Sequence, residues 1–117
     1  MKVYIAGRIT GNDNYKKQFQ EAEELLISQG HYVLNPCKNW GFEYKEYIDM
    51  GLAELSKCDA IYMLEGWEES RGAILEMHYA MAIAMPVRNI SNELFRQYAG
   101  IYFPDLQKCI LDKKYCK

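Results

Sequence analysis

The amino-acid sequence predicts a three-layer α/β fold, in which a parallel sheet of about four to five strands carries helices on both faces. Three observations predict it. Short apolar runs alternate with longer segments in which apolar residues recur at helical spacing. The resulting order, βαβαβαβα, is typical of parallel sheets. Polar loops follow the first three strands, and in such sheets ligands bind at the carboxyl ends of the strands.

The composition is that of one globular domain, which we expect to span residues 1–117. Half of the 117 residues are hydrophobic and 26% are charged. A net charge of -2 argues against sequence-independent nucleic-acid binding, which needs a basic face. No apolar run reaches the length of a membrane span and no signal peptide is evident, so we expect no membrane partner and a cytoplasmic location.

Cysteine and histidine are sparse and scattered. The four cysteines show no C-x-x-C spacing, and the two histidines lie far apart in the sequence. We therefore expect reduced thiols and no metal site.

The first βα unit predicts a loop that can hold a ligand. Residues 2–6 read as a buried strand, and residues 15–29 as an amphipathic helix that ends at Gly30. The loop between them, 7–14, combines two glycines with hydroxyl, amide and carboxylate groups, and loops of this kind often bind anions. Its spacing fits neither a Walker A motif nor G-x-G-x-x-G, so a simple polar turn is an equal alternative.

The second strand, residues 31–34, brings another loop to the same edge. The loop 37–43 holds Trp40 and Phe42, which either cover a base or sugar or fold back as a hydrophobic lid. The helix after it is expected over 44–57.

The third strand, residues 60–64, reads as buried. Asp59 lies at its start, far from the carboxyl edge, so we expect a structural role for this residue.

The stretch 65–84 combines that strand's exit loop with a helix that opens near Ser70. Glu76 is a lone carboxylate in this helix, and helical geometry points it toward the helix start, above the small residues Gly72 and Ala73. The helix residues expected to pack on the core recur at helical spacing: Ile74, Met77, Met81 and Ala84.

The end of the chain predicts smaller elements: a weak strand over 85–90, a helix over 92–98 capped by Ser91, and a helix over 104–112. Several apolar side chains there either form a subunit interface or cap the sheet edge: Phe95, Tyr98, Ile101, Tyr102 and Phe103.

Several short motifs, in this order and at this spacing, resemble the nucleoside 2-deoxyribosyltransferase superfamily. They are Tyr4-Ile5-Ala6-Gly7 with Ile9 and Gly11, then Asn35-Pro36, Cys58-Asp59-Ala60, and Ser70-x-Gly72-x-x-x-Glu76 with Ala80. The sequence is most similar to a mostly phage and bacterial branch, the DUF4406 type, from Val3 to about Val87. The resemblance implies a flavodoxin-like (Rossmann-like) sheet.

The resemblance also implies a chemistry. Glu76 would attack the anomeric carbon of a nucleoside, and Tyr4 would orient it. The sugar would then pass to water or to another base, with no metal or organic cofactor. It further implies a homodimer or a higher homo-oligomer. The residues implied in substrate binding are Gly7, Arg8, Ile9, Thr10, Gly11, Trp67, Ser70, Arg71 and Gly72. Trp67 either stacks on a base or packs in the core.

Position 70 favours a phosphorylated substrate. The superfamily's transferases on free nucleosides carry an aspartate there, whereas its 2′-deoxynucleoside 5′-monophosphate N-glycosidases carry a serine, as this chain does. A hydroxyl at a helix start can donate a hydrogen bond to a phosphate, which an aspartate would repel. Arg8 and Arg71 add positive charge. We therefore expect a (deoxy)nucleoside 5′-monophosphate as substrate.

The chain departs from the superfamily at Gly51, where the enzymes carry an aspartate that helps to protonate the departing base. The nearest acid, Asp49, is a candidate replacement, although it lies about 160° away around the helix. The alternative function is therefore a non-catalytic module that binds a nucleotide derivative in the same site.

Overall fold

The computed structural model describes residues 1–38, 44–91 and 93–97. Four strands form one parallel sheet in the order β2-β1-β3-β4. The strands are β1 (Lys2–Ala6), β2 (Tyr32–Leu34), β3 (Ala60–Met63) and β4 (Val87–Arg88). The helices are α1 (Tyr15–Ser28), α2 (Tyr44–Leu55) and α3 (Arg71–Ala82), with short 3-10 helices η1 (Pro36–Lys38) and η2 (Trp67–Glu69). The predicted α/β fold with a parallel sheet is confirmed.

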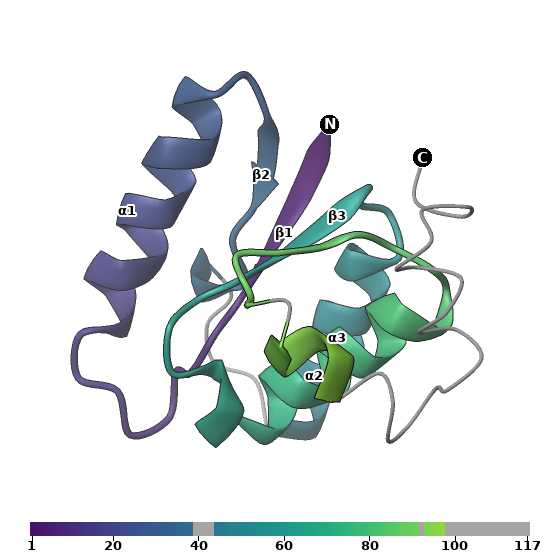
Figure 1. Cartoon of the computed structure of the whole chain (residues 1–117). Helices are drawn as coiled ribbons and strands as arrows, with labels where there is room; N and C mark the ends of the chain where they lie inside the picture. The colour runs from purple at the N-terminus through teal and green to yellow at the C-terminus, as the bar shows by residue number, and fades with distance from the viewer. Residues whose placement is uncertain (39–43, 92, 98–117) are drawn as a thin grey trace.

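The sheet separates two hydrophobic cores, because successive residues of a strand point to opposite faces. In β1, Val3 and Ile5 pack with α1, whereas Tyr4 and Ala6 pack with α2 and α3. Figure 1 shows α1 on one side of the strands and α2 with α3 on the other. The side chain of Tyr4 therefore enters the layer that contains Glu76.

Hydrogen bonds and backbone geometry fix the ends of several elements. Gly30 follows α1 with φ at +88°, a conformation in which glycine bears no Cβ penalty. The backbone N–H of Lys2 donates to Asp59 Oδ2 at 2.8 Å, and the N–H of Asp59 donates to the Lys2 carbonyl at 2.8 Å. Asp59 thus joins the amino ends of β1 and β3, as its predicted structural role requires.

The buried face of α3 differs from the predicted one. It consists of Ala73, Glu76, Met77, Ala80 and Met81. The predicted core residue Ile74 is only partly buried, and Ala84 lies beyond the end of the helix with φ at +59°. The face is rotated because α3 packs against both the sheet and α2, which brings Glu76 inside the protein.

Several expectations concern residues outside the described ranges. These are the loop residues Trp40 and Phe42, the helix expected over 104–112, and most of the expected apolar interface. Of that interface the structure describes Phe95, which is buried in the core at 7% exposure. It belongs to a helical turn, 93–97, whose Leu94 N–H donates to Ser91 Oγ at 3.1 Å. In the described part of the chain, no helix has the length and apolar character of a membrane span.

Candidate active site

A buried tyrosine–glutamate pair lies between β1 and α3. Tyr4 Oη donates a hydrogen bond to Glu76 Oε2, and the two residues expose only 1% and 9% of their surface. Among the side chains whose burial the structure describes, Glu76 is the one charged side chain that is buried. The two residues stand 72 positions apart in the sequence, and the fold brings them together as the resemblance predicts.

Burial changes the acidity of both groups. It raises the pKa of Glu76 from 4.5 to about 7, although the hydrogen bond from Tyr4 lowers it, and the charge of Glu54 adds a further rise. Burial, and then the charge of Glu76, raise the pKa of Tyr4 well above its ordinary value. Near neutral pH, Glu76 is therefore divided between its charged and neutral forms, while Tyr4 remains a hydrogen-bond donor.

The third element at this site is the bare backbone of α2. A Cβ atom added to Gly51 would lie 2.7 Å from Glu76 Oε2 and 2.9 Å from Tyr4 Oη. The sequence shows Gly51 only as the position that lacks the aspartate of related enzymes. Nothing in the sequence predicts that this residue lies against Tyr4 and Glu76. Glu54 lies three positions later, on the same helix face by register. The three-residue spacing from Gly51 to Glu54 is the sequence signal that could have placed Glu54 near the site.

The predicted acid Asp49 does not face the pair. It is exposed, whereas Gly51, two positions later, is buried against Glu76. Residues two positions apart in a helix are separated by about 160° around its axis, so one face of α2 cannot present both. The expectation that Asp49 protonates the departing base is therefore not supported by the structure.

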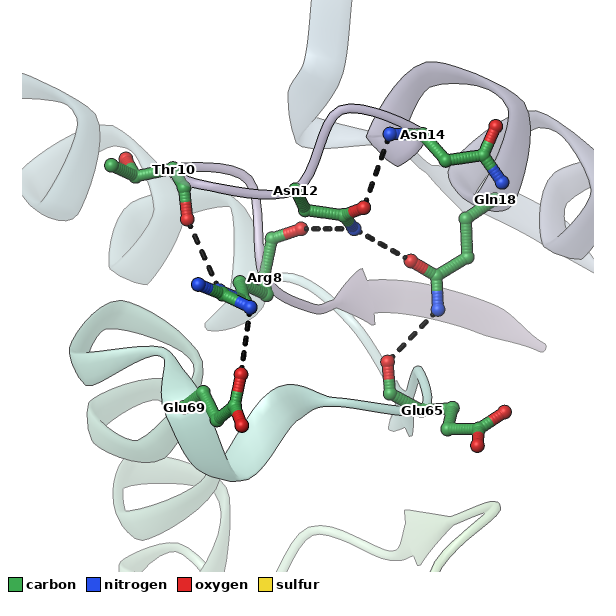
Figure 2. Close-up of polar contacts among 7 residues, drawn as sticks. All are labelled: Arg8, Thr10, Asn12, Asn14, Gln18, Glu65 and Glu69. Carbon is green, nitrogen blue, oxygen red and sulfur yellow. Dashed lines mark hydrogen bonds and ion pairs between the residues drawn. The ribbon is translucent and has the colours of Figure 1, made fainter.

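The loop after β1 is tied to η2 by an ion pair, which Figure 2 shows. Arg8 Nη1 lies 2.7 Å from Glu69 Oε2, and Arg8 Nε donates to the Thr10 carbonyl at 3.2 Å. Gly11, with φ at +78°, lies so close to Arg8 that an added Cβ would stand 2.8 Å from Nη2. The guanidinium predicted to bind a phosphate is thus already paired with a carboxylate that the sequence did not single out.

A second connection runs through amide side chains, also visible in Figure 2. Asn12 Nδ2 donates to the Arg8 carbonyl at 3.0 Å and to Gln18 Oε1 at 2.9 Å. Gln18 Nε2 in turn donates to the Glu65 carbonyl at 2.9 Å. The loop after β1 is therefore fixed to both α1 and the segment that follows β3.

The other predicted residues of this loop differ in their surroundings. Gly7 is buried, and an added Cβ would stand 3.0 Å from Leu64 and 3.2 Å from Phe19, so glycine allows close packing here. Ile9 and Thr10 are exposed at the carboxyl edge of the sheet. Of these three, only Ile9 and Thr10 present side chains that a ligand can reach.

Ser70 begins α3 as its N-cap. Its Oγ accepts a hydrogen bond from the Ala73 N–H at 3.1 Å, which confirms the predicted helix start. Arg71 is exposed and Gly72 is half-buried, and their N–H groups belong to the first turn, which has no intrahelical acceptors. Trp67 is 2% exposed within the core, so its ring packs there and offers no stacking surface.

Comparison with known proteins places this chain in a family. Residues 1–89 match the model described as Domain of unknown function (DUF4406). The chain belongs to the DUF4406 family. No curated protein matches its sequence.

The structure of this DUF4406 domain is similar to that of a 2-deoxyribosyltransferase from the psychrotolerant bacterium Bacillus psychrosaccharolyticus. The match has a TM-score of 0.64 at 20% identity, and covers 94% of this chain and 90% of that one. At this identity the likeness shows a shared fold.

All the predicted site residues of the DUF4406 domain lie inside the matched range 1–89. Two groups of them meet in space: Tyr4 with Glu76, and the loop around Arg8 with the segment that leads to Ser70. Where the structure describes the chain, no three His, Cys, Asp or Glu side chains are placed to hold a metal ion.

Proposed function

We propose that this DUF4406 domain cleaves the base–sugar bond of a (deoxy)nucleoside 5′-monophosphate, with Glu76 as the nucleophile. The buried Tyr4–Glu76 pair is the observation that supports this proposal most. A carboxyl group with a strongly raised pKa, held by one specific hydrogen bond, is typical of functional sites. The fold shared with a 2-deoxyribosyltransferase is consistent with sugar-transfer chemistry.

The pair suits a displacement at the anomeric carbon. Tyr4 holds Oε2, and among the described residues Oε1 accepts no hydrogen bond, so Oε1 is the attacking oxygen. A bond forms between Oε1 and C1′ while the C1′–N bond breaks, and its electron pair leaves with the base, which takes up a proton from solvent. Water then attacks C1′, the C1′–Oε1 bond breaks to free Glu76 as a carboxylate, and the attacking water gives up one proton to solvent, which yields the sugar phosphate. A second base in place of water gives transfer.

The start of α3 suits the 5′-phosphate. Glu76 lies six positions after Ser70, which is about 9 Å along the helix, and the side chain of Glu76 leans back toward Ser70. A sugar with a 5′ substituent can bridge that span. The N–H groups of Arg71 and Gly72, together with the Arg71 guanidinium, favour an anion at this end. Arg8 adds a second guanidinium once it exchanges Glu69 for phosphate.

Base release measured on a panel of ribo- and deoxynucleosides and their 5′-monophosphates tests this proposal. We expect release from a monophosphate, and a loss of about a thousandfold or more in kcat for Glu76→Gln. Glu68→Gln, which changes an exposed carboxylate near the same helix, serves as the matched control and should retain full activity. Full activity in Glu76→Gln would exclude the nucleophile, and faster release from free nucleosides would exclude the phosphate preference.

The second candidate function is a non-catalytic module that binds a nucleotide derivative. The contact of Gly51 with the pair favours it, because α2 offers no acidic side chain at that position to protonate a departing base. Saturable binding of a monophosphate without base release, and equal binding by Glu76→Gln, would establish this function in place of the first.

We also propose that the chain assembles as a homodimer or a higher homo-oligomer, as the family resemblance implies. Light scattering during gel filtration measures the mass of the assembly directly. A mass of 13.7 kDa, that of one chain, would exclude this part of the proposal.

A further inference from the structure

Gly51 contacts both members of the buried pair. The position is buried in α2, and an added Cβ would approach Glu76 Oε2 to 2.7 Å and Tyr4 Oη to 2.9 Å. Such approaches are shorter than Cβ atoms make in folded proteins, so the neighbouring atoms would have to move. The carboxylate and the hydroxyl therefore occupy the space in which any other residue's side chain would begin.

We infer that Gly51 is a positioning residue for Glu76, and that the bare α2 backbone fixes the carboxylate that acts in the proposed reaction. This inference rests on the proposed function. Tyr4 holds Oε2 from the sheet side and Gly51 confines the same oxygen from the α2 side. With Oε2 confined between two elements, Oε1 has one orientation from which to attack C1′.

Gly51 has no side chain that could donate a proton, so in this protein the proton for the departing base does not come from this position. The other titratable groups that act on Glu76 are Tyr4 of β1 and Glu54 of α2. The close contact of α2 therefore serves to place the nucleophile and not to supply an acid.

A size-exchange experiment tests this inference. Gly51→Ala should lower kcat for base release about a hundredfold with little change in KM, because a small displacement of a reacting group has an effect of that order. Alanine favours the helix, but its methyl group overpacks the core, so the folding transition should fall modestly while the variant stays folded. Ala53→Ser adds one atom to an exposed position of the same helix, and it should keep kcat within about twofold.

The double variant provides a readout that a purely structural role would not change. Glu76→Asp withdraws the carboxylate by one methylene and should itself lose most activity. The double variant Gly51→Ala with Glu76→Asp should have a kcat about tenfold higher than the less active of the two single variants, because the shorter side chain makes room for the methyl group. Full activity in Gly51→Ala, or no recovery in the double variant, would overturn the inference.

A second measurement separates this inference from the proposed function. If the wild type releases no base, the proposed function fails, and the position of Glu76 is then tested by carbon-13 NMR titration of its carboxyl group. Gly51→Ala should move the titration midpoint by about half a pH unit or more, and Ala53→Ser should leave it in place. An unmoved midpoint in Gly51→Ala would overturn the inference whatever the activity.

Discussion

Two polar pairs connect distant segments of this protein, and they differ in almost every physical respect. Tyr4 and Glu76 join β1 to α3 inside the core, whereas Arg8 and Glu69 join the loop after β1 to η2 at the surface. The side chains of Arg8 and Glu69 are 36% and 66% exposed, while the whole of Glu76 is only 9% exposed. Water reaches one pair and is almost excluded from the other.

The surroundings of each pair, more than its two partners, decide what the pair does. Burial raises the pKa of Glu76 to about 7, so the fold determines both the protonation state and the orientation of this side chain. An exposed ion pair contributes only about 0–1 kcal/mol to stability, so Arg8 can exchange its carboxylate for a phosphate at little cost. The Tyr4–Glu76 pair has the properties of a reactive group, whereas the Arg8–Glu69 pair has those of a contact that a ligand can replace.

The largest expected effect is on the pH dependence of stability in Glu76→Gln. The folded chain holds the Glu76 proton with a pKa of about 7, against 4.5 in its ordinary state. This group's contribution to stability is thus complete below pH 4.5 and is lost as the pH rises through 7. The shift corresponds to a loss on the order of 3 kcal/mol, which Glu76→Gln should not show.

Urea unfolding of the wild type and of Glu76→Gln at pH 4 to 8 measures this loss. The difference between the two proteins cancels the other carboxyl groups, which titrate in both. Glu69→Gln, which changes an exposed carboxylate, is the matched control. Parallel curves for the wild type and Glu76→Gln would show that Glu76 does not titrate as a buried group.

The next largest effect is expected for Tyr4→Phe. The hydrogen bond from Tyr4 lowers the pKa of Glu76, so its removal should raise that pKa further. A rise of about one unit would reduce the ionised fraction of Glu76 at pH 7 from about a half to about a tenth, with base release about fivefold slower and a pH profile displaced upward. Tyr62→Phe, which alters a half-buried hydroxyl on β3, is the matched control. A profile displaced downward would contradict this assignment.

The fold and one of these pairs are predictable from the sequence. Alternating apolar runs and helical spacing identify the parallel sheet, and motifs that resemble a known superfamily identify Tyr4 and Glu76. The contact with Gly51 is not predictable, since it depends on how closely α2 approaches α3.

The Arg8–Glu69 pair cannot be predicted from the sequence, for another reason. Several acidic residues are possible partners for Arg8, and only the fold brings Glu69 beside it. The predicted buried face of α3 is confirmed at Met77 and Met81, but it omits Glu76 because apolar character alone ranked Ile74 above it. A helix that packs on two neighbours at once buries a wider face than one apolar stripe indicates.

A smaller effect is expected at Ser70, which lies between Glu69 and Glu76 in the sequence. Ser70→Ala removes the N-cap of α3 and should lower the free energy of unfolding by about 1 kcal/mol, measured in urea. Ser70→Asp keeps a capping oxygen, so its stability should stay near that of the wild type. Its negative charge should nevertheless weaken binding of a monophosphate about tenfold, and leave a free nucleoside unaffected. Equal weakening for both ligands would place the phosphate elsewhere.

The smallest effect on stability is expected for Glu69→Gln. An exposed pair of this kind is screened by salt, so its loss should cost at most about 1 kcal/mol, and less still at 1 M salt. Binding should respond in the opposite direction. With Glu69 neutral, Arg8 is released toward the phosphate, and the KM for a monophosphate should fall several-fold while that for the free nucleoside stays constant. Arg8→Gln should reverse this preference. If neither variant changes the ratio of the two KM values, the Arg8–Glu69 pair only ties the loops together.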